Sequence, residues 1–326
     1  MRYIIAILLL TVALECVNAE PVSDRLLQRK AKATDAKALF DLAMSYDTGL
    51  GVAKNKREAV KWLRLSAERR YPRAQYNLGL CYYYGDGVEQ DYPTALNWFL
   101  QAANQGMPEA QYSVGLCHAL GLGVARDCET AVRWFRRAAE QGYAKAQYCL
   151  ACCFDFGEGL DADKVEALKW YKRAAIGGNA QAQYALGCCY DFGEGTETDR
   201  AEARKWYLAA AEQGYASAQF NLATMYLNGD GLPKDPAEAV KWYGRAAEQG
   251  FADAQYVLGN CYHNGLGVPA DDVEAIFWWK LASANGHEYA LYNFENACQN
   301  LSEEEQGQLQ ARAEKWLAGH SRRGGE

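Results

Sequence analysis

Positive charge is scarce in this sequence. Its 326 residues carry 34 lysines and arginines against 41 acidic residues, which gives a net charge of −7 and a pI near 5.3. A surface that binds nucleic acid needs a basic stripe, because it must neutralise phosphates. The composition therefore argues against nucleic acid as a partner.

An apolar run long enough to span a bilayer is also missing. The run from Tyr3 to Leu14 is interrupted only by Thr11, and its twelve residues fall short of the ~20 that a spanning helix needs. It follows Met1-Arg2 and precedes Val17-Asn18-Ala19, which fits a small-residue cleavage site. We predict a signal peptide at residues 1–19, an exported protein (periplasmic or secreted) and no membrane span after cleavage; an uncleaved anchor is the alternative.

Catalytic patterns are absent as well. No serine has a lysine three residues later, and the four histidines are scattered without a nucleophile beside them. Asp155-Phe156-Gly157 and Asp191-Phe192-Gly193 spell a kinase triplet, but no phosphate loop or catalytic loop accompanies them. The acidic loops around both triplets lack the alternating acids of a calcium cage. We predict a protein that is not an enzyme and that holds no cofactor or metal.

What the sequence has is a repeat of 36 residues. Tryptophan recurs at this spacing seven times, and alanine does the same; the two series are Trp62, Trp98, Trp134, Trp170, Trp206, Trp242 and Trp278, and Ala38, Ala74, Ala110, Ala146, Ala182, Ala218 and Ala254. Self-similarity at a fixed period of this length is typical of a solenoid, in which each repeat packs only on its neighbours.

Each repeat reads as two helices joined by a glycine loop. In the copy that starts at Ala218, apolar residues follow at helical spacing until Asn228-Gly229-Asp230-Gly231 ends the helix. Asp235 then caps a second helix, with Glu238 three residues on in a capping-box arrangement. The equivalent caps in the other copies are Asn55, Asp91, Asp127, Asp163, Asp199 and Asp271, with reciprocal acids at Glu58, Glu166, Glu202 and Glu274.

A small residue stands five positions after each repeated alanine, at Ala43, Gly79, Gly115, Ala151, Gly187, Ala223 and Gly259. Glycine inside a helix costs about 1 kcal/mol relative to alanine, so its recurrence indicates close approach of two helices. We expect the repeated tryptophans to fill the space opposite and to form the core between repeats. We place an N-terminal capping helix and linker at residues 20–34, repeats at 35–286, and C-terminal capping helices and tail at 287–326.

The recurring segments Ala-Gln-Tyr-x-Leu-Gly, Gly-x-Gly-Val and Trp-Tyr-x-x-Ala-Ala-Glu-Gln-Gly resemble the Sel-one-like repeat, a relative of the tetratricopeptide repeat. The resemblance covers roughly residues 35 to 300. It implies an all-α fold, a right-handed α/α superhelical solenoid of seven helix-turn-helix repeats with capping helices at both ends. It also implies an adaptor function, since family members include secreted and periplasmic bacterial proteins that regulate signalling or engage host cells.

The cysteines divide into a repeated column and a cluster. Cys81, Cys117, Cys153, Cys189 and Cys261 share one position of the repeat, where Met225 stands in the sixth copy, so we interpret them as buried core thiols. Cys149, Cys152 and Cys188 lie in two adjacent repeats and form a possible disulfide cluster, with a zinc site as a lesser alternative. In cysteine-rich members of the resembled family, disulfides pair the two helices of one repeat, which would here suit only Cys117 with Cys128.

Columns that vary between copies are free to bind a partner. On the first helix they lie three, six, nine and ten positions after the alanine, on the face that lines the concave side of the resembled superhelix. We expect this face to hold a protein or peptide ligand. Its candidate residues are Tyr83, Tyr84, Leu116, Leu120, Phe156, Phe192, Asn221, Asn228, Asn260 and Asn264, with Cys152 and Cys188 between them. Packing against the neighbouring helix is the alternative for these side chains. A cell-wall or β-lactam hydrolase and a purely structural, self-assembling solenoid are the alternative functions.

Overall fold

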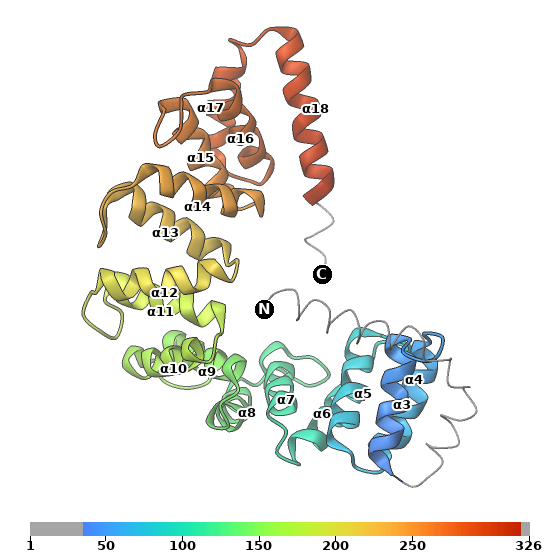
Figure 1. Cartoon of the computed structure of the whole chain (residues 1–326). Coiled ribbons are helices and arrows are strands. Elements are labelled where there is room, and N and C mark those ends of the chain that lie inside the picture. The colour runs from blue at the N-terminus through green and yellow to red at the C-terminus, as the bar shows by residue number, and fades with distance from the viewer. Residues whose placement is uncertain (1–34, 321–326) are drawn as a thin grey trace, which may run out of the picture. The chain divides into compact units, whose positions relative to one another are not determined.

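The computed structural model describes residues 35–320, which form sixteen α-helices and no strand (Figure 1). The signal peptide and N-terminal capping helix expected before residue 35, and the tail after residue 320, lie outside the described residues. The helices are α3 (Ala36–Thr48), α4 (Lys56–Glu68), α5 (Pro72–Tyr84), α6 (Tyr92–Ala103), α7 (Pro108–Leu120), α8 (Cys128–Glu140), α9 (Ala144–Phe156), α10 (Lys164–Ile176), α11 (Ala180–Phe192), α12 (Arg200–Glu212), α13 (Ala216–Asn228), α14 (Pro236–Glu248), α15 (Ala252–Asn264), α16 (Asp272–Ala284), α17 (Glu288–Cys298) and α18 (Glu303–His320).

The helices pack in chain order, as an all-α solenoid requires. The chain divides into two compact units. The N-terminal unit comprises the described residues up to Ala146 together with Glu158–Asp161. The C-terminal unit comprises Gln147–Gly157 together with the described residues from Ala162 onwards. Within each unit, first helices pack on the second helix of their own repeat, as α5 does on α6, and second helices pack on the next first helix, as α6 does on α7.

The predicted caps of the second helices are confirmed, but the capping boxes are not. Asp235 Oδ1 accepts a hydrogen bond from the Glu238 N–H at 3.0 Å. The backbone N–H of Asp235, which Glu238 would have to bind, already donates to the Tyr226 carbonyl at 2.8 Å. Glu238 therefore turns outward and pairs with Lys241 at 2.7 Å. The same three contacts recur in the first repeat around Asn55, whose N–H donates to Tyr46.

The prediction that the repeated tryptophans fill the space beside the small residues is wrong. A side-chain carbon added to Gly79 would lie 2.6 Å from the Phe99 ring, and one added to Gly187 would lie 2.6 Å from the Tyr207 ring. Phe99 and Tyr207 each follow a repeated tryptophan by one position, so this next column, which also includes Phe135 and Trp279, fills the space.

The tryptophan column lies nearer the surface. Trp170, Trp242 and Trp278 are buried, whereas Trp62, Trp98, Trp134 and Trp206 are half-buried. Arginine side chains cover several of the indoles: the guanidinium of Arg173 lies 4.5 Å from the Trp170 ring and that of Arg245 lies 4.2 Å from the Trp242 ring. A helix has one line of closest approach, and the residue one position on from tryptophan occupies it.

A ladder of buried glutamines ties consecutive repeats together. Gln111 donates to the Ala103 carbonyl at the end of the preceding repeat at 3.2 Å, and its own oxygen accepts from Gln141 at 2.8 Å. The same contacts recur at Gln75, Gln183, Gln219 and Gln255. Each buried amide thus adds a second donor to a helix-end carbonyl that already accepts a backbone N–H, as the Ala103 carbonyl does from Gly106, and in this way links it to the next repeat.

The glycine loops make a second link between repeats. Gly87 has φ of 75°, and a side-chain carbon there would lie 2.6 Å from the Lys56 carbonyl oxygen at the start of the preceding second helix. Beside it, Lys56 pairs with Asp86. Arg200 and Asp230 form the equivalent ion pair in the C-terminal unit. Glycine is required here both for the left-handed backbone and for the close approach.

The predicted C-terminal caps are confirmed as α17 and α18. Ser302 and Glu305 form the capping box expected at the start of α18, with the Ser302 N–H donating to Glu305 at 2.8 Å. Arg312 of α18 donates to Glu274 through its two terminal guanidinium nitrogens, at 2.6 and 2.8 Å, and covers the Phe277 ring. The last helix therefore covers the first half of α16.

Candidate functional site

Large apolar side chains are exposed at the last residue of several first helices. Tyr84, Leu120, Phe156 and Phe192 occupy the same position of four successive repeats and are 70 %, 61 %, 71 % and 69 % exposed. All four are in the set that we expected on the partner-binding face. Exposed apolar side chains at one repeated position are typical of an interaction surface rather than of a stacking contact.

In the N-terminal unit, Tyr84 borders a hollow of about 230 Å³ that we call the tyrosine hollow. It contains three of the predicted residues, Tyr83, Tyr84 and Leu116. Its complete lining is Tyr76, Leu80, Tyr83, Tyr84, Phe99, Tyr112, Ser113, Leu116, Tyr143 and Lys145. Tyr83 packs against two other aromatic side chains, since its ring lies 4.9 Å from that of Tyr84 and 5.3 Å from that of Tyr92.

A second hollow of about 240 Å³ lies on the other side of α5. Its lining includes Met44 of α3, Asn77 and Cys81 of α5, and the Lys56–Asp86 pair. Leu80 and Tyr84 line both hollows. The exposed edge of α5 therefore forms a ridge with a recess on each side. Side chains of a ligand could bind in the two recesses.

Our criterion that only varying columns bind a partner missed part of this surface. Tyr76 and Tyr112 belong to a column that is aromatic in every repeat, and we took such columns as scaffold. Both line the tyrosine hollow, and burial raises the pKa of the Tyr76 hydroxyl, which also shares a hydrogen bond with Ser113 of the next repeat. The sequence signal for this part of the surface was the tyrosine hydroxyl, because phenylalanine would suffice for an aromatic side chain that is only buried.

The column six positions after the alanine serves the repeat itself. Its residue faces the aromatic 19 positions later: Trp279 donates to Asn260 Oδ1 at 3.0 Å, and the Tyr243 hydroxyl lies 2.8 Å from Thr224 Oγ1. In the N-terminal unit the same two positions hold the apolar pairs Met44 with Leu63, Leu80 with Phe99, and Leu116 with Phe135. Variation in this column therefore follows its partner on the second helix.

The expected disulfide cluster of Cys149, Cys152 and Cys188 is not formed, and no disulfide joins any cysteine of residues 35–320. Cys152 and Cys188 instead occupy the column just described, with Sγ 3.5 Å from the Tyr171 hydroxyl and 3.4 Å from the Tyr207 hydroxyl. The pairing of Cys117 with Cys128 that the family resemblance implied is not formed either.

The core-thiol interpretation of the repeated column is confirmed for four of its five cysteines. Cys117, Cys153, Cys189 and Cys261 are buried, and Cys81 is half-buried. Burial raises the pKa of Cys117 to about 11 and that of Cys189 to about 12. Such thiols stay protonated and unreactive at neutral pH.

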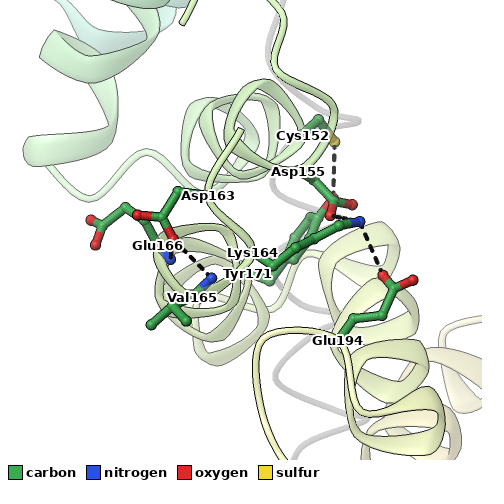
Figure 2. A network of polar contacts seen from close by, with 8 residues as sticks. All are labelled: Cys152, Asp155, Asp163, Lys164, Val165, Glu166, Tyr171 and Glu194. Carbon is green, nitrogen blue, oxygen red and sulfur yellow. Dashed lines mark hydrogen bonds and ion pairs between the residues drawn. The ribbon is translucent and has the colours of Figure 1, made fainter. Parts of the chain in front are cut away.

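The acidic loops of the C-terminal unit are organised by one lysine, as Figure 2 shows. Lys164 donates to Asp155 at 2.6 Å and reaches Glu194 of the next repeat at 3.3 Å. The Tyr171 hydroxyl lies 3.1 Å from the other Asp155 oxygen, so this carboxylate is almost fully covered. The hydrogen bond to Asp155 is the main reason that the pKa of Lys164 lies above its ordinary value. Asp163 serves only as the cap of α10, as predicted.

The four asparagines expected to grip a ligand backbone all make internal hydrogen bonds. Asn260 accepts from Trp279, and the Asn264 amide donates to the Asn260 carbonyl at 2.8 Å. Asn228 donates to Asp230 at 3.3 Å. Asn221 bonds the hydroxyls of Tyr184 and Tyr207. The apolar members of the predicted set, rather than the asparagines, therefore define the candidate surface.

Nothing in this arrangement assembles reactive groups. Within residues 35–320, histidine, cysteine and acidic side chains form no cluster that could hold a metal ion. Over the same residues, every helix is too short or too polar to cross a bilayer. The site consists of apolar recesses with tyrosine hydroxyls at their edges, which can bind a partner's side chains.

Comparison with known proteins agrees with the repeat architecture. A family model described as the Sel1 repeat matches seven consecutive segments, residues 36–71, 72–107, 108–143, 144–179, 180–215, 216–251 and 252–287. A Sel1 repeat protein from Oxalobacter formigenes is 36% identical, with a TM-score of 0.72, over 83% of this chain and 79% of that chain. A protective antigen of uropathogenic Escherichia coli with an SLR fold is 29% identical, with a TM-score of 0.45, over 90% of this chain and 78% of that chain. No curated protein matches the chain.

Proposed function

Because the chain belongs to the Sel1 repeat family, whose members are generally protein-interaction scaffolds, we propose that it is an exported, non-catalytic adaptor. In this proposal the ends of the first helices bind a protein or peptide ligand. The observation that carries it is Tyr84, which is 70 % exposed on a ridge between two recesses. Burying an aromatic side chain of this size on binding contributes about 2–3 kcal/mol.

Site-specific photocrosslinking in the native host tests the interaction surface. A photoreactive phenylalanine analogue at Tyr84 or Leu120 should give a discrete crosslinked product, because both side chains would contact the ligand. The same analogue at Leu65 is the matched control, since this residue is exposed but lies on the second helix α4. Equal products from all three positions, or none, would contradict the proposal.

The export and non-catalytic parts need separate measurements. We expect the mature protein to begin near Glu20 and to leave the cytoplasm with its leader removed, which mass spectrometry of cell fractions can read. Purified protein should not turn over cell-wall or β-lactam substrates. Turnover that survives repurification would establish the hydrolase alternative, and a ligand-free oligomer in light scattering would favour the self-assembling one.

A further inference from the structure

The fourth and fifth repeats carry two nearly identical exposed surfaces in the C-terminal unit. The segments are Cys-Cys-Phe-Asp-Phe-Gly from Cys152 and Cys-Cys-Tyr-Asp-Phe-Gly from Cys188. Each places an exposed phenylalanine at a helix end, with Phe156 71 % and Phe192 69 % exposed. No other repeat has an Asp-Phe pair at this position, so the stacking of repeats does not require it.

The two surfaces differ in how their acidic groups are neutralised. Asp155 is paired with Lys164 at 2.6 Å and is only 11% exposed. The residue equivalent to Lys164 in the next repeat is Arg200, and it pairs with Asp230 rather than with Asp191. In the part of the chain that the structure describes, Asp191 has a hydrogen-bond contact with the Tyr207 hydroxyl, at 3.4 Å, but no cationic partner.

Further carboxylates add to this negative charge. Glu194 follows Phe192 by two residues and is half exposed, with Lys164 3.3 Å away as its only cation among the described ion pairs. Lys164 is already shared with Asp155, and its Nζ lies 5.8 Å from the Phe156 ring. Glu197, exposed in the same loop, forms no ion pair in the described residues. The surface beside the two phenylalanines therefore has an excess of negative charge.

From this combination we propose that Phe156 and Phe192 bind a basic amphipathic helix of a partner protein. Two apolar side chains of that helix would bury the phenylalanines, and its lysines or arginines would face Asp191, Glu194 and Glu197. The inference rests on the proposed scaffold function and names the chemistry of its ligand.

Spacing and fold both favour a helix as the occupant. We take the spacing of the two phenylalanines as roughly 10 Å, the general distance between neighbouring helices. Side chains at i and i+7 of an α-helix are separated by about 10.5 Å along its axis, so they can meet both phenylalanines. Binding by strand addition needs a sheet edge, and residues 35–320 contain no strand.

A synthetic probe tests the charge and the spacing together. The probe is a fluorescent helical peptide of alanine and lysine, with leucine at i and i+7 and lysines flanking both leucines. Its controls carry glutamate in place of each lysine, or leucines at i and i+4. We expect binding of the basic i,i+7 probe at low salt, at least about tenfold weaker binding at high salt, and at least about tenfold weaker binding of both control peptides.

Protein variants identify the surface. The double variant Phe156→Ala with Phe192→Ala and the single variant Asp191→Asn should each weaken probe binding by about tenfold or more, with unchanged helical circular dichroism. Ile176→Ala, at an exposed apolar position on α10, should bind like the native protein. No binding of the basic probe, equal binding of the acidic control, or binding that survives the double variant would overturn the proposal.

The result of the probe-binding experiment can be distinguished from the result of the test of the scaffold function. Tyr84→Ala changes the N-terminal unit and should leave probe binding unchanged. If crosslinking at Tyr84 succeeds while the basic probe does not bind, the scaffold function stands and only the chemistry of its ligand is wrong.

Discussion

Single residues in this chain are constrained mainly by backbone conformation and by burial. Arg70 has φ of 64° and is the only described non-glycine residue with positive φ. Glycine takes its place in the next copies, for example Gly106 with φ of 89°. A side chain in this left-handed region costs about 1–2 kcal/mol, so the first repeat is strained at one identifiable position.

Replacing Arg70 by glycine should therefore stabilise the protein. We expect a gain of about 0.5–1 kcal/mol in the free energy of unfolding, because the relief of strain exceeds the added entropy of the unfolded chain. Gly106→Ala is the matched control and should lose about 1 kcal/mol through its backbone alone, since a side-chain carbon there meets no atom within 4 Å. Urea denaturation measures both, and a destabilised Arg70→Gly variant would refute the assignment of strain.

The buried thiols predict a specific pH dependence. The pKa of Cys261 rises from 9.0 to about 11 on folding, and that of Cys189 rises to about 12, in both cases chiefly because burial disfavours the thiolate. The unfolded state releases its protons first, so this contribution to stability is complete below pH 9 and is lost as the pH rises towards 11–12.

Thiol labelling of the native protein at a single pH checks that burial suppresses thiolate formation. A thiol reagent at pH 8 should modify the buried column at least about a hundredfold more slowly in native protein than in urea, because little thiolate forms in the folded state. A native rate that matches the unfolded rate would show that these thiols are accessible.

At the scale of elements, helices are joined by matched pairs. Where the aromatic of the second helix carries a polar tip, as Trp279 does, the first helix supplies an acceptor such as Asn260. The glutamine ladder does the same between repeats. Gln219 is 4% exposed, donates to the Ala211 carbonyl at 3.0 Å and accepts from Gln249 at 2.8 Å. Interrupting such a network removes the hydrogen bonds that join one repeat to the next.

Gln219→Leu should accordingly destabilise the protein, although leucine is similar in size to glutamine. It removes the hydrogen bonds that Gln219 makes to the Ala211 carbonyl and to Gln249, while the Ala211 carbonyl keeps the Gly214 N–H as a partner and Gln249 keeps the Arg245 carbonyl. We expect a loss of about 1–2 kcal/mol in the free energy of unfolding. Gln249→Ala removes only the exposed partner and should cost less than about 1 kcal/mol. Chemical denaturation of the two variants decides, and equal losses would mean that the ladder does not stabilise the stack.

At the scale of the whole molecule, stability is distributed along an array in which each repeat contacts only its neighbours. The end of such an array needs a cap. Helix α18 supplies one through Leu309, which is buried, and through Arg312, which binds Glu274 and lies 3.6 Å above the Phe277 ring. The C-terminal repeats should therefore depend on α18 more strongly than the N-terminal ones.

Removing residues 303–326 tests this dependence. We expect hydrogen exchange to accelerate in α15 and α16, because Phe277 and neighbouring apolar surface become exposed, while α5 and α7 keep their protection. Arg312→Ala should give a smaller effect in the same helices. Uniform acceleration along the chain would instead indicate a single cooperative unit.

The sequence by itself determined the repeat, its helices and its caps. Helix caps such as Asp235 and Gly229 act on a few neighbouring residues, so local backbone chemistry and the repeat period are enough to predict where helices begin and end. Only the tertiary structure decided which of two adjacent aromatics, Trp98 or Phe99, meets Gly79. It likewise decided that Cys152 faces a tyrosine rather than another thiol. Both choices depend on the rotation of each helix about its axis, and one residue of helix turns a side chain by about 100°, which the repeat period leaves unspecified.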